Sequence, residues 1–314
     1  MKKYLFFLLL ISSLLYLNCS SLNTKHKDKY NYILHKGLER SFVVYRPSNL
    51  NTTNKYPLLI VLHGGHGTGN RMQDLTLGKF NTIADKENFV VIYPNGFKKN
   101  WNDGRINMPK SYAAHNQNID DVGFIKALIE KAKEDYNIDE KRIYIAGMSN
   151  GAMMTHRLAI ELSDKIAAAV PVCGNLPSDL KSIPKNRVPI MIINGTKDPL
   201  VPYNGGFVHF MKKKLGNISS TEESIQFWIN NNGLKNTIFT NEFIDSDVSD
   251  FCTVNKTTFI VPDNNNEVIF VRIDGGGHTW PGGWQYLNEK IIGKTCRDID
   301  ACQLIWDFCK NHSK

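Results

Sequence analysis

Residues 142–154 read RIYIAGMSNGAMM, and this stretch decides the fold. Its first five residues form a short apolar run typical of a buried strand, and the residues from Ala152 onward suit a packed helix. Between them, Gly147-Met148-Ser149-Asn150-Gly151 is a Gly-x-Ser-x-Gly sequence. Between a strand and a helix, this pattern predicts a sharp turn that holds one serine hydroxyl clear of its neighbours. Gly147 and Gly151 are expected because a side chain at either position would crowd the turn.

A serine hydroxyl is a weak nucleophile, so this turn requires a base and an acid elsewhere in the chain. Asp198 ends the loop NGTKD (194–198) after an apolar run at 188–193, and His278 ends GGGH (275–278) after the run VIFVRI (268–273). The order is therefore serine, aspartate, histidine, which is the order found in α/β-hydrolases. Three chemical roles at strand ends are a more specific signal than the serine turn alone.

Apolar runs alternate with helical patterns through most of the chain, which predicts a mainly parallel sheet with helices on both faces. No linker-like stretch divides these predicted strands and helices. We expect one catalytic domain over residues 30–314. Strands are predicted at 40–46, 56–62, 89–93, 142–146, 166–172, 188–193, 237–244 and 268–273, and helices within 72–87, from Asp120 or Asp121, and at 219–232 and 301–310.

Several segments together resemble the secreted esterase family of α/β-hydrolases that includes polyhydroxybutyrate depolymerases and feruloyl or acetylxylan esterases. They cover nearly all of the chain after Tyr30 and read LHGGHGTG (62–69), YPNG (93–96), WNDG (101–104), DDVGF (120–124), GMSNGAMM (147–154), GTKDPLVPYNGG (195–206), GGGHTWPGG (275–283) and LIWDF (304–308). Two departures stand out: Cys309 replaces a second aromatic residue after Phe308, and residues 241–266 match weakly, which leaves their contacts with substrate open.

The resemblance implies the α/β-hydrolase fold and a catalytic triad of Ser149, His278 and Asp198. In this reading Ser149 attacks an ester carbonyl, His278 accepts and returns the proton, and Asp198 orients the imidazole. The oxyanion requires two backbone N–H donors. One is expected from Asn150, directly after the nucleophile, and the other from Gly65 or His66 in the loop after strand 56–62. His63 is expected to brace that loop.

Three tryptophans are candidates for substrate contact. Trp101 lies in a long polar loop at 98–118, and Trp280 and Trp284 flank Pro281-Gly282-Gly283 directly after His278. Each ring is equally well explained as a wall of an acyl or sugar pocket and as ordinary packing. His115, His156 and His209 have no motif support and are expected to be ordinary surface or helix residues.

Residues 1–18 have the features of an export signal, with Lys2 and Lys3 followed by the apolar run 4–17. That run is shorter than the roughly 20 residues of a membrane-spanning helix. Cys19 follows it closely, as in bacterial lipoproteins, although Tyr16-Leu17-Asn18 is not the usual sequence before a lipidated cysteine. We expect a secreted or cell-envelope protein, lipid-anchored through Cys19, with 19–29 as a polar tether. A plainly cleaved secretory signal is the alternative.

The composition is that of a globular chain of 314 residues with a formal charge of +8 and 42% hydrophobic residues. No nucleic-acid motif accompanies the basic residues, and no metal-binding spacing occurs, so neither nucleic acid, metal nor cofactor is predicted. Asp120 and Asp121 suit a helix start, and Asp245, Asp247 and Asp250 a solvated loop. The oligomeric state and the pairing of any disulfides stay open. The cysteines besides Cys19 are Cys173, Cys252, Cys296, Cys302 and Cys309.

The sequence therefore favours a serine carboxylesterase that acts on oligomeric or polymeric esters of hydroxyalkanoate, feruloyl or acetyl type. A membrane is expected as a partner only through the N-terminal lipid anchor. Two rival functions remain: a serine peptidase of the same fold, and a surface lipoprotein that binds without catalysis. Peptidases of this fold commonly carry an additional domain, which is not apparent here. The complete Ser149, Asp198 and His278 set argues against the second rival.

Overall fold

The strands form one large sheet and a separate hairpin in the computed structural model, which describes residues 30–51, 53–210, 213–234, 238–261 and 266–314. The predictions for residues 1–29, including Cys19, lie outside the described residues. The sheet contains β1 (Asn31–His35), β2 (Leu38–Tyr45), β3 (Tyr56–Leu62), β4 (Val90–Pro94), β5 (Ile138–Met148), β6 (Ala168–Val172), β7 (Ile190–Gly195), β10 (Ile238–Ile244), β11 (Thr253–Ile260) and β12 (Val268–Asp274).

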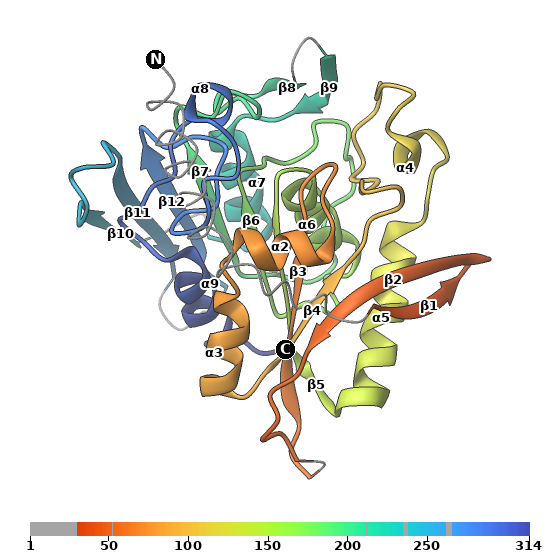
Figure 1. Ribbon diagram of the computed structural model, residues 1–314. Coiled ribbons are helices and arrows are strands. Elements are labelled where there is room, and N and C mark those ends of the chain that lie inside the picture. Colours follow the sequence, from red (N-terminus) through yellow and green to blue (C-terminus); the bar gives the residue numbers. More distant parts are fainter. Residues whose placement is uncertain (1–29, 52, 211–212, 235–237, 262–265) are drawn as a thin grey trace, which may run out of the picture.

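The sheet order is β1-β2-β4-β3-β5-β6-β7-β12-β11-β10. From β4 to β12 every neighbouring pair is parallel, whereas β1, β2, β10 and β11 join by antiparallel pairing. Figure 1 shows the antiparallel pairs at opposite margins of the sheet. The carboxyl ends of the parallel strands therefore lie along one edge, where ligand sites of open α/β sheets are found.

Helices cover both faces of the sheet, as Figure 1 shows. One face carries α5 (Asp121–Tyr136), α6 (Asn150–Glu161) and α7 (Thr221–Asn231), and the other carries α2 (Gly69–Leu75), α3 (Lys79–Glu87) and α9 (Ala301–Cys309). Strand β3 shows why both faces are covered. Leu58 and Ile60 pack into one core and Leu59 and Val61 into the other, because successive side chains of a strand point to opposite faces.

This mainly parallel sheet between two helical layers confirms the predicted α/β-hydrolase fold class. The start of α5 is also as expected: Asp120 is its N-cap and accepts a hydrogen bond from Gly123 N–H at 2.8 Å. Asp121, the next residue, is fully buried against Arg40, whose Nη2 lies 2.6 Å from its Oδ1. Asp120 therefore caps the start of a helix, and Asp121 forms a buried ion pair.

The helix predicted within residues 72–87 is present, but the helical structure there is divided between α2 and α3. Leu77 and Gly78 adopt φ angles of 56° and 65° and so break the helical path between the two helices. Residues 206–218 include an unpredicted hairpin of β8 (Gly206–Phe210) and β9 (Lys213–Ile218), and β11 was not predicted either. The described residues also contain two short helices, α4 (Ala113–Asn116) and α8 (Glu289–Ile292).

Among the helices in the described ranges, none combines the length and the apolar character needed to cross a membrane.

Candidate active site

Ser149 lies between the end of β5 and the start of α6, in a strained backbone conformation. Its φ is 58° and its ψ is −120°, in a region that residues other than glycine rarely adopt. The Ser149 N–H donates to Val172 O at 3.0 Å and so ties the turn to the end of β6. The serine is half-buried. This is the sharp strand-to-helix turn that the sequence predicts.

The two glycines of the turn are required by close backbone approaches. A Cβ on Gly147 would lie 2.5 Å from Gly151 O, and a Cβ on Gly151 would lie 2.6 Å from the carbonyl oxygens of Leu62 and His63. Since real Cβ contacts are longer than this, a side chain on Gly147 would push β5 away from the start of α6, and a side chain on Gly151 would push α6 away from the end of β3. The structure thus confirms the steric reason for both glycines.

His278 and Asp198 form a buried pair in the loops after β12 and β7. His278 Nδ1 lies 2.7 Å from Asp198 Oδ2, and their side chains are 4% and 3% exposed. The other carboxylate oxygen of Asp198 accepts the N–H groups of Leu200 and Val201, both at 2.8 Å. An aspartate held this way fixes the orientation of the imidazole and keeps its proton on Nδ1, which leaves Nε2 free to accept a proton.

Ser149 and the His278–Asp198 pair both lie next to the end of β6. Val172 accepts the Ser149 N–H, and the next residue is Cys173, whose Sγ lies within 4.8 Å of ligand atoms of both Asp198 and His278. Within the described residues, no hydrogen bond joins Ser149 Oγ to His278. Hydrogen bonds of this kind are often formed only when substrate is bound. Cys173 itself is buried, and burial raises the pKa of its thiol well above the usual range.

The two segments predicted to supply the oxyanion donors both lie next to Ser149. Asn150 is the first residue of α6, where a backbone N–H has no partner within its own helix. A Cβ on Gly64 would lie 3.3 Å from Ser149 Cβ, so the loop after β3 packs against the nucleophile. In that loop, the Gly65 N–H has no hydrogen-bond acceptor among the described residues, whereas the His66 N–H donates to Asn100 Oδ1 at 3.4 Å. Of the two residues proposed, Gly65 therefore has the free donor.

His63 braces this loop, as expected. Its Nε2 accepts the Gly96 N–H at 2.9 Å, and its Nδ1 donates to Gly64 O at 2.7 Å. Both ring nitrogens are thus occupied by the backbone, and only the neutral ring fits this arrangement. Burial lowers the pKa of His63 from 6.5 to about 4. His156, expected to be an ordinary helix residue, is buried in α6, where its Nδ1 accepts Trp228 Nε1–H at 3.0 Å and burial lowers its pKa to about 3.

Because these two histidines are neutral in the folded chain, we predict that its free energy of unfolding decreases in mild acid. Both pKa values are lower in the folded chain than the unfolded value of 6.5, so between pH 6.5 and about 4 the unfolded chain binds more protons. The free energy of unfolding should therefore fall by about 1.4 kcal/mol per histidine for each pH unit below 6.5. Urea unfolding at pH 7, 6 and 5 measures this slope. The variant His156→Gln, which keeps an acceptor for Trp228, should have a shallower slope, and an identical slope would contradict the assignment to this residue.

The three tryptophans do not share one environment. Trp101 and Trp280 are both 0% exposed, whereas Trp284 is 54% exposed. Trp101 Nε1–H donates to His63 O at 2.9 Å, and Trp280 packs edge-on against Phe80. Of the two readings left open, packing is the one that fits Trp101 and Trp280, because a fully buried ring has no surface for substrate. Only Trp284 is placed to meet a ligand.

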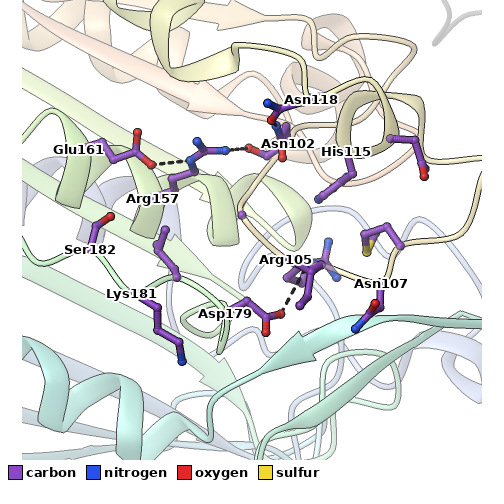
Figure 2. Close-up of a pocket in the computed structure, with 15 residues that line it drawn as sticks. Asn102, Arg105, Asn107, His115, Asn118, Arg157, Glu161, Asp179, Lys181 and Ser182 are labelled. Atoms are coloured by element: carbon purple, nitrogen blue, oxygen red, sulfur yellow. Dashed lines mark hydrogen bonds and ion pairs between the residues drawn. The ribbon is translucent and has the colours of Figure 1, made fainter.

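Two open cavities lie outside the Ser149 turn. One, of about 540 Å³, lies between the loop after Asn102 and α6; Figure 2 shows Arg157 between Glu161 and Asn102 on one of its walls. The other, of about 560 Å³, lies between α7 and the strands β10 to β12. Neither of these two cavities is lined by Ser149, Asp198 or His278. The catalytic candidates are therefore identified by their geometry and not by cavity size.

Sequence reasoning missed one polar cluster next to the site. His115, expected to be an ordinary residue, has a buried side chain whose Nε2 lies 2.9 Å from Asp103 Oδ1, and Arg105 forms an ion pair with the same carboxylate. Asp103 in turn contacts Asn150. The motif WNDG (101–104) was the available signal, since it places an acidic residue in a segment that carried the family resemblance.

Comparison with known proteins adds information at the level of family. Residues 43–223 match the model of the dienelactone hydrolase family. The putative esterase NocK of Nocardia uniformis subsp. tsuyamanensis is 27% identical over 259 residues, which are 80% of this chain and 73% of that protein.

Two further relatives are larger proteins. The bifunctional acetylxylan esterase/xylanase XynS20E of Neocallimastix patriciarum is 34% identical over 175 residues, 55% of this chain and 23% of that protein. Feruloyl esterase B of Piromyces equi is 27% identical over 198 residues, 62% of this chain and 36% of that protein. The match thus spans well under half the length of these two relatives.

A solved structure, described as that of a thermostable esterase, superimposes with a TM-score of 0.51 at 18% identity and covers 91% of this chain and 63% of that chain. At this identity the likeness supports the fold alone.

Proposed function

This chain belongs to the dienelactone hydrolase family, and we propose that it is an extracytoplasmic serine carboxylesterase with Ser149, His278 and Asp198 as its catalytic triad. Its relatives named as esterases support the coarser statement, that it is a carboxylic ester hydrolase. The observation that carries the finer proposal is the strained Ser149 turn at the same sheet edge as the hydrogen-bonded His278–Asp198 pair. Residues 30–314 are proposed to act as one catalytic unit.

The proposed reaction follows from these positions. Ser149 Oγ attacks the ester carbonyl while His278 Nε2 accepts its proton, and Asp198 stabilises the imidazolium that forms. The negative charge on the former carbonyl oxygen is bound by the N–H groups of Asn150 and Gly65. The alcohol then leaves with the proton from His278. A water molecule, deprotonated by His278, hydrolyses the acyl-enzyme and restores the Ser149 hydroxyl.

An apolar cluster next to the turn supports an acyl-binding role. Met153 N–H donates to Ser149 O, and Val201 N–H donates to Asp198 Oδ1, so both residues are anchored to the proposed triad. They pack together with Tyr112, Val208, Leu215 and Ile218. The Tyr112 ring also lies 5.4 Å from the ring of His66. We propose that the half-buried side chains of Met108 and Phe210, which pack against this cluster, receive the acyl part of the substrate. The substrate is proposed to be an oligomeric or polymeric ester of hydroxyalkanoate, feruloyl or acetyl type.

Hydrolysis of p-nitrophenyl acetate and butyrate by the purified protein tests the proposed function. Release of p-nitrophenol with saturation kinetics is expected, and absence of turnover on both esters would contradict the proposal. Hydroxybutyrate oligomers, feruloylated arabinoxylan fragments and acetylated xylan, assayed side by side, then identify the acyl group that the enzyme prefers.

The lipid anchor is proposed separately, because Cys19 lies outside the described residues. Replacing Cys19 with serine should move the protein from the membrane fraction to the soluble fraction, since a lipidated cysteine holds a protein to the bilayer. Cell fractionation followed by immunoblotting measures this distribution, with Ser20→Ala as the neighbouring control. If the Cys19→Ser protein stays with the membranes, the anchor proposal is wrong.

A further inference from the structure

The segment Asn100–Asp103 bridges the two proposed oxyanion donors. On the side of Gly65, Asn100 Oδ1 accepts the His66 N–H at 3.4 Å and would lie 3.3 Å from a Cβ on Gly65. Trp101 Nε1–H bonds to His63 O, at the base of the same loop. Asn100 and Trp101 therefore contact the loop after β3 from His63 to His66.

On the other side, the segment holds the side chain of Asn150. Asn150 Oδ1 accepts the Trp101 N–H at 2.8 Å, and Asn150 Nδ2 donates to Trp101 O at 3.0 Å and to Asp103 Oδ2 at 2.6 Å. Asn150 is 3% exposed, so these bonds are shielded from water. Since three bonds fix the side chain, they also fix the backbone of the first residue of α6, including the direction of its N–H.

Asp103 is the centre of this network and is 0% exposed. Besides Asn150, its carboxylate accepts bonds from Arg105 Nη2 at 2.6 Å and from His115 Nε2 at 2.9 Å. Burial alone would raise the pKa of Asp103, but the charge of Arg105 and the hydrogen bonds from His115 and Arg105 outweigh it and hold the pKa far below its usual range. The carboxylate is therefore charged and oriented from several sides, which makes it a rigid acceptor for Asn150.

We propose that Asp103 is a positioning residue for the oxyanion hole, acting through the side chain of Asn150. The inference rests on the proposed function, because it assigns the Asn150 N–H to the oxyanion. Asp103 does not touch the substrate. It fixes the Asn150 N–H relative to the Gly65 N–H, so that both donors meet the oxygen where charge develops.

The variant Asn150→Ala tests this inference because it keeps the backbone N–H and removes all three side-chain bonds. We expect kcat to fall by about 10- to 100-fold, less than the roughly 10²–10³-fold effect of losing a donor outright. KM should change by less than about threefold, because the donors bind a charge that exists only in the transition state. Inhibition by phenylboronic acid, which forms a tetrahedral adduct with the serine, should weaken in parallel with kcat.

Asn232 provides a matched control. Its side chain is also buried and also binds one backbone N–H and one backbone C=O, those of Val188, at 3.1 and 2.8 Å. Val188 precedes β7, at the opposite end of that strand from Asp198. Asn232→Ala should therefore lower the melting temperature as much as Asn150→Ala does but leave kcat unchanged. Equal losses of kcat in the two variants would overturn the inference.

A double-mutant cycle assigns the effect to Asp103. Asp103→Asn should lower kcat by about tenfold in the wild-type protein but by less than about twofold in the Asn150→Ala protein, since coupled residues are not additive. Additive losses, or wild-type kcat in Asn150→Ala, would overturn the positioning role while leaving the esterase proposal intact. A wild-type protein without turnover would overturn the esterase proposal and, with it, this inference. If Asp103→Asn does not fold, the comparison of kcat between Asn150→Ala and Asn232→Ala still tests the positioning role.

Discussion

Replacing Ser149 with alanine is expected to lower kcat on a p-nitrophenyl ester by about 10⁴–10⁶-fold. Without Oγ no acyl-enzyme can form, and only the weak catalysis by the oxyanion donors and by substrate binding is left. Ser149 Oγ has no hydrogen-bond partner in the part of the chain that the structure describes, and alanine keeps the Cβ that the turn already accommodates. The melting temperature should therefore stay within a few degrees of the wild-type value.

Ser163→Ala is the control for this experiment. Ser163 is also buried, but its Oγ accepts the N–H groups of Lys185 and Asn186 and contacts no residue of the proposed site. It should show wild-type kcat and a lower melting temperature. An Ser149→Ala enzyme that kept more than about one hundredth of wild-type kcat would mean that another residue is the nucleophile.

Replacing Asp198 with asparagine should have the second largest effect, a loss of kcat of about 10³–10⁴-fold. The Oδ1 of Asp198 accepts two backbone N–H groups, from Leu200 and Val201. An asparagine would keep its carbonyl oxygen there and turn its NH₂ toward His278 Nδ1. Two donors would then face one another unless the proton of His278 moved to Nε2, where it prevents the ring from accepting the serine proton.

Steady-state kinetics of Asp198→Asn, with Glu267→Gln beside it, measures this effect. Glu267 Oε1 lies 3.1 Å from His312 Nε2, so this control also removes a carboxylate from a histidine, but at the carboxyl terminus of the chain. Glu267→Gln is expected to show wild-type kcat. A loss below tenfold for Asp198→Asn would show that this carboxylate does not orient the catalytic base.

The sequence was sufficient for the parts of the site that depend on local pattern. The glycines around Ser149, and the polar loops that carry Asp198 and His278, stand directly after apolar runs, and each run became a strand of the parallel part of the sheet. Parallel strands with the same direction bring such loops to one edge. That rule, and not any single motif, is the basis for grouping residues that lie far apart in the chain, and of these residues His278 and Asp198 are in hydrogen-bond contact.

The missed features lack a local signal. Strand β11 reads TVNKTTFI and is mostly half-buried, so it shows neither a continuous apolar run nor a clean alternation. The hairpin of β8 and β9 lies outside the main sheet, and its strands contain two lysines and two glycines. The role of Asp103 depends on contacts with Arg105, His115 and Asn150 that only the folded chain creates. The burial of Trp101 and Trp280 likewise follows from packing, which a sequence pattern does not specify.

The most direct test of the central claim is the reaction of the purified protein with a fluorophosphonate, followed by digestion and peptide mass spectrometry. These reagents phosphonylate a serine that an adjacent base activates. We predict one phosphonyl group per chain, attached to Ser149 in the peptide that contains GMSNGAMM, and no labelling of the Ser149→Ala protein. A label on any other serine, or an unlabelled wild-type protein that still hydrolyses p-nitrophenyl acetate, would contradict the account.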